Sequence, residues 1–281
     1  DRPETLSYLE WDGRTLGNWT AALEGADAVI NLAGRSVNCR YHAQNRRLML
    51  DSRVNATRVL GEAIARCGRP PRVWLNFSTA TIYKHTFGPA WDETGDIGAT
   101  PKAKDAFSIE VATAWERAFN EAATPRTRKV ALRSAMVFGL SDDANNVYRV
   151  LRRLVRCGLG GRMGSGRQFV SWIHETDFCR AVEFLIDRED LRGPVNLAAP
   201  NPLTNADMMA VLRRVLKRAV GLPATECMLE LGAFFLRTET ELIIKSRRVI
   251  SGRLREAGFQ FQFEQLEAAV RDLESRLNAK S

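Results

Sequence analysis

Three short groups of residues stand where a ligand would meet them, because each directly follows an apolar, β-branched run. They are residues 32–34, 78–80 and 133–139. In an open parallel sheet, ligands bind beyond the carboxyl ends of the strands, so these groups would share one edge of the sheet. Gly34 would let the backbone approach a flat ligand closely, although it could equally serve only to turn the chain.

Titratable side chains near these strand ends are candidates for proton transfer. They are Tyr83, His85 and His174. A phenol or an imidazole can donate or accept a proton when it lies within hydrogen-bond reach of a reacting atom. For each of the three, a packed or hydrogen-bonded structural role is the more frequent alternative.

An alternation of strands and helices would position these groups. The residue pattern predicts strands at 28–32, 73–78 and 129–134, and helices at 43–67, 106–122 and 146–157. Strands that alternate with long helices predict an α/β fold with a doubly wound parallel sheet, covered by helices on both faces.

The pattern changes after Gly158. A glycine-rich stretch at 158–166 is followed by a short predicted strand at 168–173, a helix at 177–187 and the strand-like VNLAAP at 195–200. Helices dominate beyond residue 204, most clearly at 205–220 and 263–277. We therefore expect a sheet domain at 1–157 and a smaller, mostly helical lobe at 158–281 that packs on it from the substrate side.

The composition excludes several classes of protein. The chain has 281 residues, of which 45% are hydrophobic and 26% charged, which is typical of a soluble globular protein and unlike a disordered or collagen-like chain. Its five cysteines include no CxxC pair and no short Cys/His spacing, so neither a disulfide framework nor a zinc site is predicted. No apolar run is long enough to span a bilayer, and no signal-peptide pattern opens the chain. A reducing intracellular compartment, the cytoplasm or the mitochondrial matrix, is expected.

The basic charge has two interpretations. The net charge is +8, and only seven of the 41 basic residues are lysines. The arginines are spread along the chain, which favours a solvated basic surface over a site for a polyanion. The predicted helix at 146–157 carries Arg149, Arg152, Arg153 and Arg156 on one face, and an RNA or an acidic protein remains the alternative partner of that face.

Five strings of residues carry a resemblance to a known family. They are NLAG (31–34), FSTATIY (77–83), ALRSAMVFG (131–139), GLGGRMGSGRQFVSWIHETDF (158–178) and VISGRLREAGFQFQFEQLEAAVRDL (249–273). Together they resemble the extended short-chain dehydrogenase/reductase superfamily, and within it the NAD-dependent epimerase-like subfamily that has a similar tail. The similarity runs from about residue 11 to residue 273, and the glycine-rich string with its SWIH is the most specific part.

The resemblance implies a Rossmann-type domain that binds NADP or NAD. Leu32, Ala33 and Gly34 would lie along the adenosine and ribose part of the cofactor. Arg53 occupies a position where the superfamily often has an asparagine, and its guanidinium could pair with a phosphate or ribose oxygen. Arg133, at the end of a strand, could likewise pair with a phosphate or ribose oxygen. For Arg53, an ordinary exposed helical arginine is the alternative.

The catalytic positions depart from the family pattern. The superfamily uses a Ser or Thr, a Tyr, and a Lys four residues beyond that Tyr. Thr79 takes the place of the hydroxyl, with Ser78 beside it, but Phe107 and Val111 stand where the Tyr and the Lys would be. Phenylalanine has no proton to exchange and valine has no charge, so the usual reductase chemistry is not available from these two positions.

The phosphate-binding turn also departs from the pattern. A Rossmann fold holds the pyrophosphate at a glycine-rich turn after its first strand. The glycine-rich stretch at 158–166 follows a predicted helix instead, so we expect it to cover the substrate side, with Arg162 or Arg167 as possible anion ligands. The first βαβ half-unit is thus expected to be trimmed, left out or lost, and cofactor binding requires that turn in the intact protein.

Two functions remain open from the sequence. The first is an epimerase-like short-chain dehydrogenase/reductase-type protein that binds NADP(H), with a degenerate Tyr/Lys pair and an unknown small-molecule substrate. The second is a non-catalytic structural or assembly subunit, a pseudoenzyme that keeps the fold, in a larger or RNA-containing complex.

Overall fold

The computed structural model describes residues 6–141, 146–225, 228 and 241–279. Its centre is a four-stranded sheet in the order β1-β2-β3-β7, and every neighbouring pair is parallel. The strands are β1 (Ala28–Asn31), β2 (Val73–Thr79), β3 (Arg128–Ser134) and β7 (Gly193–Leu197). The expected α/β fold with a parallel sheet is confirmed.

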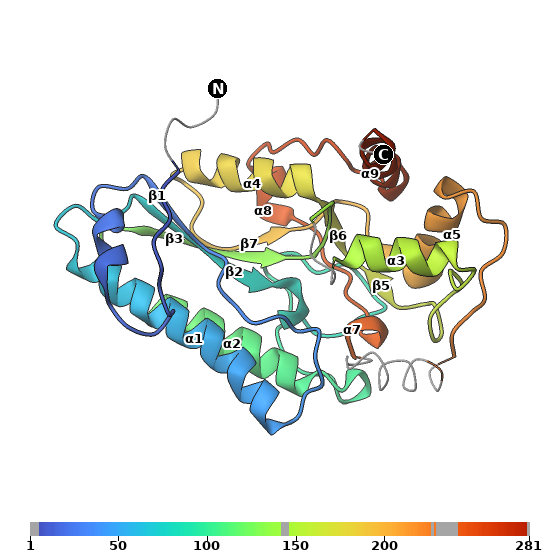
Figure 1. The fold of residues 1–281 in the computed structure, drawn as a ribbon, viewed down its shortest axis with the longest axis horizontal. Coiled ribbons are helices and arrows are strands. Elements are labelled where there is room, and N and C mark those ends of the chain that lie inside the picture. Colours follow the sequence, from blue (N-terminus) through green and yellow to red (C-terminus); the bar gives the residue numbers. More distant parts are fainter. Residues whose placement is uncertain (1–5, 142–145, 226–227, 229–240, 280–281) are drawn as a thin grey trace.

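Helices cover both faces of this sheet (Figure 1). On one face lie α1 (Ala43–Arg66) and α2 (Ala106–Glu121), and on the other α4 (Glu175–Asp187) and α8 (Gly252–Glu256). The strands alternate accordingly: Trp74 and Ala131 pack in the core under α1 and α2, whereas Leu75 and Leu132 pack in the core under α4. This two-residue period explains why the strand sequences are apolar almost throughout.

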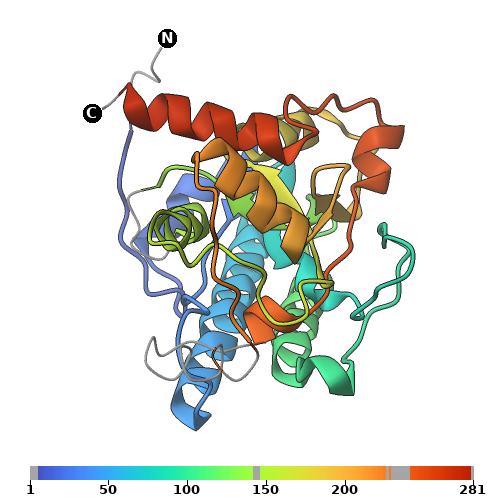
Figure 2. The ribbon, with the colours of Figure 1, turned by 90° about the vertical axis from the view of Figure 1, so that its right-hand side faces the viewer.

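Beyond the sheet, the second half of the chain builds a lobe of short strands and helices. Two small pairs of strands join it: β4 (Met136–Phe138) with β6 (Trp172–His174) in parallel, and β5 (Phe169–Val170) with β8 (Leu203–Thr204) antiparallel. The helices are α3 (Val147–Arg156), α5 (Asn205–Val215), α7 (Glu241–Ile244) and α9 (Leu266–Asn278). In Figure 2, α9 lies across the top of this lobe with α5 beneath it, and both contribute to one apolar cluster with α3.

Three short 3-10 helices complete the described elements. They are η1 (Asn18–Leu23), η2 (Ala80–Ile82) and η3 (Pro101–Ala103). The second of them directly follows β2, so the chain turns at the end of that strand. None of the helices that the structure describes combines the length and the apolar character needed to cross a bilayer.

Several predicted boundaries differ from the structure. The single strand predicted at 168–173 is two strands, because residues 169–170 pair with β8 and residues 172–174 pair with β4. Between them, the Ser171 hydroxyl lies within hydrogen-bond distance of the backbone oxygens of Arg247 and Val249. The helix predicted to reach residue 220 ends at Val215, and Lys217 two residues later has a positive φ of 54°. The separate strand β4 was not predicted.

The division expected at residue 157 does not follow the sheet. Strand β7 lies in the second part of the chain, yet it pairs with β3 at the edge of the main sheet. Helix α4, also from the second part, covers one face of that sheet. The second part of the chain therefore contributes both to the C-terminal lobe and to the main sheet with its core.

Strand β1 forms the other edge of the sheet. Among the described residues, no strand pairs with its outer side. Ile30 and Leu32 are 43% and 58% exposed along it. An open edge with apolar side chains is a surface on which a further strand can pair.

The core under α4 makes a stability prediction. Leu132→Ala should lower the free energy of unfolding by about 2 to 5 kcal/mol, because it opens a cavity in close-packed surroundings; Leu132 is fully buried. The matched variant Leu222→Ala, at a residue that is 60% exposed, should change it by less than about 0.5 kcal/mol. Urea unfolding of both variants measures the difference, and equal losses would show that the described core is wrong.

Candidate functional site

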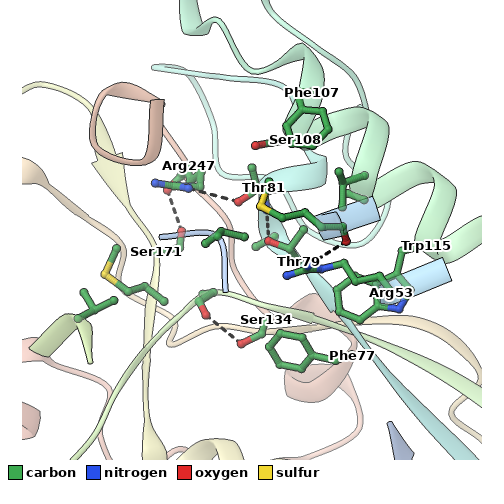
Figure 3. Close-up of a pocket in the computed structure, with 18 of the residues that line it drawn as sticks. Arg53, Phe77, Thr79, Thr81, Phe107, Ser108, Trp115, Ser134, Ser171 and Arg247 are labelled. Atoms are coloured by element: carbon green, nitrogen blue, oxygen red, sulfur yellow. Dashed lines mark hydrogen bonds between the residues drawn. The ribbon is translucent and has the colours of Figure 1, made fainter. Parts of the chain in front are cut away.

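A cavity of about 330 Å³ lies at the carboxyl ends of β2 and β3. This is at the small end of the range for small-molecule sites. Figure 3 shows its walls, which come from the ends of the two strands, from α1, α2 and the loop before α1, and from the C-terminal lobe. Its lining includes Tyr41, Arg53, Phe77, Thr79, Thr81, Phe107, Val111, Trp115, Ser134, Ser171 and Arg247.

The two candidate hydroxyls at the end of β2 point to different places. Thr79 lines the cavity, and its Oγ1 accepts a hydrogen bond of 3.1 Å from the backbone N–H of Thr81. Ser78 is fully buried and donates to Glu116 Oε1 over 2.6 Å. Successive side chains of a strand alternate between its faces, so only Thr79 is placed to touch a ligand in this cavity.

One face of α2 forms the wall opposite the strand ends. Phe107, Val111 and Trp115 are spaced by four residues and all line the cavity. In Figure 3, Phe107 and Trp115 both border the cavity from α2. The positions that resemble the superfamily's Tyr and Lys therefore face the cavity, but with a phenyl ring and an isopropyl group.

Arg53 is a cation at this wall that has no carboxylate partner among the described residues. Its Nη1 donates to the backbone oxygen of Met49 over 3.1 Å, and its Cζ lies 5.1 Å from the centre of the Trp115 ring. Among the described residues, no carboxylate lies within ion-pair distance of it. Burial lowers the pKa of Arg53 below the ordinary value for arginine. A desolvated guanidinium of this kind is a ready site for an anionic or oxygen-rich ligand.

The other predicted cofactor residues lie at the end of β1, outside the cavity wall. Leu32 and Gly34 are exposed, and the backbone N–H of Ala33 donates to Asn31 Oδ1 over 3.0 Å. A Cβ at Gly34 would come within 3.1 Å of Arg53 Cζ. Glycine at this position thus leaves room for the guanidinium that reaches the cavity.

A buried polar network beneath these residues was not predicted. Asn31 Nδ2 donates to Asn76 Oδ1 over 2.7 Å, and Trp115 Nε1 donates to Thr57 Oγ1 over 3.0 Å, with Thr57 also 3.3 Å from Asn31 Nδ2. These bonds tie β1, β2, α1 and α2 together at the cavity end. The available signal was an asparagine inside each of two otherwise apolar strands.

Arg133 does not line the cavity. Its Nε and Nη2 each donate to Glu116 over 2.8 Å, and its Nη1 donates to the Tyr83 hydroxyl over 2.9 Å. Burial opposes its charge, but the hydrogen bonds and the charge of Glu116 outweigh that effect and raise the pKa of Arg133. Three N–H groups of Arg133 thus donate to two buried partners, which hold its guanidinium inside the protein beside the strand ends.

The three titratable candidates near the strand ends are also held by the protein. Tyr83 donates to Asn196 Oδ1 over 2.8 Å, and burial raises its pKa. His85 accepts at Nδ1 from the backbone N–H of Ser246 over 2.9 Å. His174 is fully buried, with Nε2 3.2 Å from Asp272 Oδ2 and its ring against Phe263. None of the three lines the cavity.

The glycine-rich stretch at 158–166 packs against the segment after α5. The backbone N–H groups of Gly161 and Gly164 donate to the oxygens of Leu222 and Ala224. Arg162 donates to the Ser165 oxygen, and Arg167 lies over the Phe87 ring. No residue of this stretch lines the cavity, so the expected cover over the substrate side and its anion ligands are not formed at this cavity.

The C-terminal segment reaches the cavity wall, which the sequence did not predict. Lys245 Nζ lies 2.6 Å from Asp105 Oδ2, and both side chains are fully buried. Asp105 precedes α2, the helix of Phe107 and Val111. Two residues beyond Lys245, Arg247 Nη1 donates to Thr81 Oγ1 over 3.2 Å, as Figure 3 shows. The segment therefore helps to set the position of α2 and the shape of the cavity.

The described residues include no group of three or more His, Cys, Asp or Glu side chains that could hold a metal ion. Among the described residues that line the cavity, the charged groups are the two guanidinium groups of Arg53 and Arg247. The remaining walls are largely aromatic and aliphatic. The cavity thus suits a ligand that is partly apolar and partly anionic or rich in oxygen atoms.

Comparisons with known proteins agree with this arrangement. Residues 2–198 match the profile of the NAD dependent epimerase/dehydratase family, and residues 224–273 match a domain of unknown function. An epimerase family protein of Mycobacterium bovis is 31% identical over 271 residues, covering 95% of this chain and 85% of that protein. The human epimerase family protein SDR39U1 is 29% identical over 258 residues, covering 90% and 84%.

Solved structures of epimerase family proteins superpose on this chain. The crystal structure of human SDR39U1 with NADPH superposes with a TM-score of 0.80 at 27% identity, covering 89% of this chain and 82% of that one. A nucleoside-diphosphate sugar epimerase from Corynebacterium glutamicum superposes with a TM-score of 0.70 at 26% identity, covering 94% and 49%.

The buried Arg133 pair predicts a large loss of stability. Glu116→Ala should lower the free energy of unfolding by about 3 to 5 kcal/mol, because it leaves a buried guanidinium uncompensated. Glu62→Ala, which removes an exposed partner of Arg66 on α1, should cost less than about 1 kcal/mol. Urea denaturation compares the two, and a similar small loss for both would contradict the role of Arg133 as a structural centre.

His174 predicts a pH dependence of stability. Burial lowers its folded pKa below the ordinary 6.5, and the charge of Asp272 offsets this only in part. The unfolded chain therefore binds a proton first, so stability should fall as the pH drops from about 6.5 through the lowered folded pKa, by up to about 1.4 kcal/mol per pH unit. His174→Gln should flatten this slope in urea unfolding across that range, whereas His42→Asn, at an exposed helix cap, should keep it. A slope unchanged in His174→Gln would assign it to other groups.

Proposed function

The chain belongs to the NAD dependent epimerase/dehydratase family, and from this membership we propose that it is an epimerase-like, reductase-type protein that binds NADP(H) at the cavity beyond β2 and β3. The observation that carries the proposal is Arg53, a desolvated guanidinium at the cavity wall that has no carboxylate partner among the described residues. Its substrate would be a small carbonyl or alcohol compound whose identity is open.

The residues present fit the nicotinamide end of such a cofactor. Gly34 leaves the space beside Arg53 open, so the guanidinium can reach a ribose hydroxyl or a phosphate oxygen. The aromatic walls of Phe77 and Phe107 suit a flat ring. The preference for NADP over NAD is supported by the relative whose structure contains NADPH.

The pyrophosphate end has no comparable holder in the part of the chain that the structure describes. No glycine-rich turn follows β1, β2, β3 or β7, and the stretch at 158–166 is engaged with residues 222–224. Binding measurements therefore belong on the full natural chain.

The proposed reaction assigns a role to four residues of the cavity wall. A reduced nicotinamide supplies a hydride to a carbonyl carbon. Thr79 Oγ1 would hold the substrate oxygen, and Phe77, Phe107 and Val111 would exclude water around it. Neither Phe107 nor Val111 can transfer a proton, so the usual donor of the superfamily does not act here.

A second function is favoured by those same two residues. A chain that keeps the fold without the usual proton donor could act as a structural or assembly subunit. Its basic helix α3 would then contact an acidic partner: Arg153 and Arg156 are exposed, whereas Arg152 is paired with Glu274 over 2.5 Å. Copurification from native lysate in a stable complex, together with absent NADPH binding, would favour this function. The compartment, cytoplasm or mitochondrial matrix, remains a prediction.

Calorimetric titration of the full natural chain with NADPH tests the proposed function. Arg53→Met should weaken NADPH binding by about ten- to a hundredfold, because it removes a charge-assisted hydrogen bond. Arg58→Met, an exposed arginine on the same helix, is the matched control and should bind like the wild type. If the wild-type chain shows no binding at millimolar NADPH, the cofactor proposal fails.

A further inference from the structure

A phenol lies on the cavity wall that the proposed function does not use. It belongs to Tyr41, which precedes α1 and is half-buried. Tyr41 packs with Met49, Phe107 and Val111 in one small apolar cluster. The chain has four tyrosines, and Tyr41 is the one that lines the cavity in the described parts of the chain.

Tyr41 meets α2 at Phe107. The two rings are 5.2 Å apart between centroids and 70° from coplanar, an edge-to-face contact. This places the Tyr41 ring directly beside the residue that takes the place of the superfamily's tyrosine. A proton donor on Tyr41 would therefore enter the same cavity from the neighbouring segment.

Arg53 meets the same face of α2 two turns further along. Its Cζ lies over the Trp115 ring, one turn beyond Val111. A cation thus lies one helical turn beyond the position where the superfamily has its lysine, but it comes from α1. Tyr41 and Arg53 together bring a phenol and a positive charge to the helix face that has lost both.

The backbone around both residues is fixed. Arg46 Nε donates to the backbone oxygen of Tyr41 over 2.7 Å, and its Cζ lies 4.9 Å from the centre of the Phe107 ring. The His42 side chain caps the start of α1. Arg53 is held by the Met49 oxygen. These contacts hold the backbone of Tyr41 and the guanidinium of Arg53 in place before any ligand binds.

The two groups interact electrostatically. Burial lowers the pKa of Arg53, and the negative charge of an ionised Tyr41 acts in the opposite direction. In the described parts of the chain, the other charged or titratable groups near them or on the cavity wall include Arg46 on α1, Cys39 in the loop before it and Arg247 on the far wall. The α2 residues that line the cavity there are Phe107, Ser108, Val111, Ala112 and Trp115.

We propose that Tyr41 is the proton donor of this site and that Arg53 is the cation that stabilises its phenolate. The inference rests on the proposed reductase-type function. The hydride from the reduced nicotinamide bonds to the carbonyl carbon, the π pair of the C=O bond moves to oxygen, and that oxygen takes the proton from Tyr41 Oη. The product is an alcohol, the nicotinamide is oxidised, and the phenolate regains a proton from water.

A difference titration of tyrosine absorbance tests the pairing without relying on activity. The spectrum of Tyr41→Phe is subtracted from that of the wild type, which isolates the ionisation of Tyr41 from every other tyrosine. The same subtraction is made in an Arg53→Met background. The Tyr41 ionisation should move to higher pH by about one unit when the cation is removed, and the matched Arg58→Met background should leave it in place.

The buried tyrosines do not disturb this readout. Burial raises the pKa of both Tyr83 and Tyr148, and a hydrogen bond to Glu274 adds to the effect at Tyr148. A Tyr41 ionisation that is indifferent to Arg53 overturns the proposal, whether or not any substrate is turned over.

Oxidation of NADPH with benzaldehyde as the carbonyl probe tests the catalytic role. Tyr41→Phe should lower the rate by about 10²- to 10⁴-fold with unchanged NADPH affinity, and Tyr8→Phe, at a residue that is 91% exposed, should retain the wild-type rate. Full activity in Tyr41→Phe overturns the proposal. Failure of the wild type to bind NADPH would instead remove the proposed function, and calorimetry separates the two results.

Discussion

The free-energy cost of burying the charged Arg133 constrains the structure around the carboxyl ends of the strands. Its side chain is 5% exposed, and a guanidinium so far from water must find both charge and hydrogen bonds in the protein. Glu116 supplies the charge from α2, and Tyr83 supplies an acceptor from the turn after β2. Because the Tyr83 hydroxyl also reaches Asn196 in β7, one buried cation fixes two strands, a turn and a helix relative to one another.

The cavity depends on that arrangement. The hydrogen bonds of Glu116 hold α2 against the sheet. They thereby fix where Phe107, Val111 and Trp115 of α2 lie relative to the strand ends. The alternation of β2 then divides two adjacent hydroxyls between different tasks: Ser78 joins Glu116 in the interior, and Thr79 faces the cavity. The buried Ser78 and the cavity-lining Thr79 are thus neighbours in the sequence, and a shift of the strand register by one residue would exchange their positions.

The sequence could predict most of the fold, because the strands and long helices are encoded in local periodicity. It could not rank Arg53, on a predicted helix, against Arg133, at a strand end, since both are arginines that the resemblance places near a cofactor. What distinguishes them is a carboxylate from a helix that lies 17 residues from Arg133 in the chain and an aromatic ring beside Arg53. Ser171, Lys245 and Arg247 were missed for the same reason: their partners lie 76 or more residues away, where no local pattern can report them.

The buried contact between Lys245 and Asp105 has a consequence for how this protein can diverge. Either charge alone in that dry position would be costly, so the two residues are expected to change together among descendants of the chain. A transplanted tail that lacked the lysine would leave the start of α2 with an isolated carboxylate. A change at Lys245 in the C-terminal segment would thus require a matching change at Asp105 before the cavity helix α2, although 140 residues separate the two charges in the sequence.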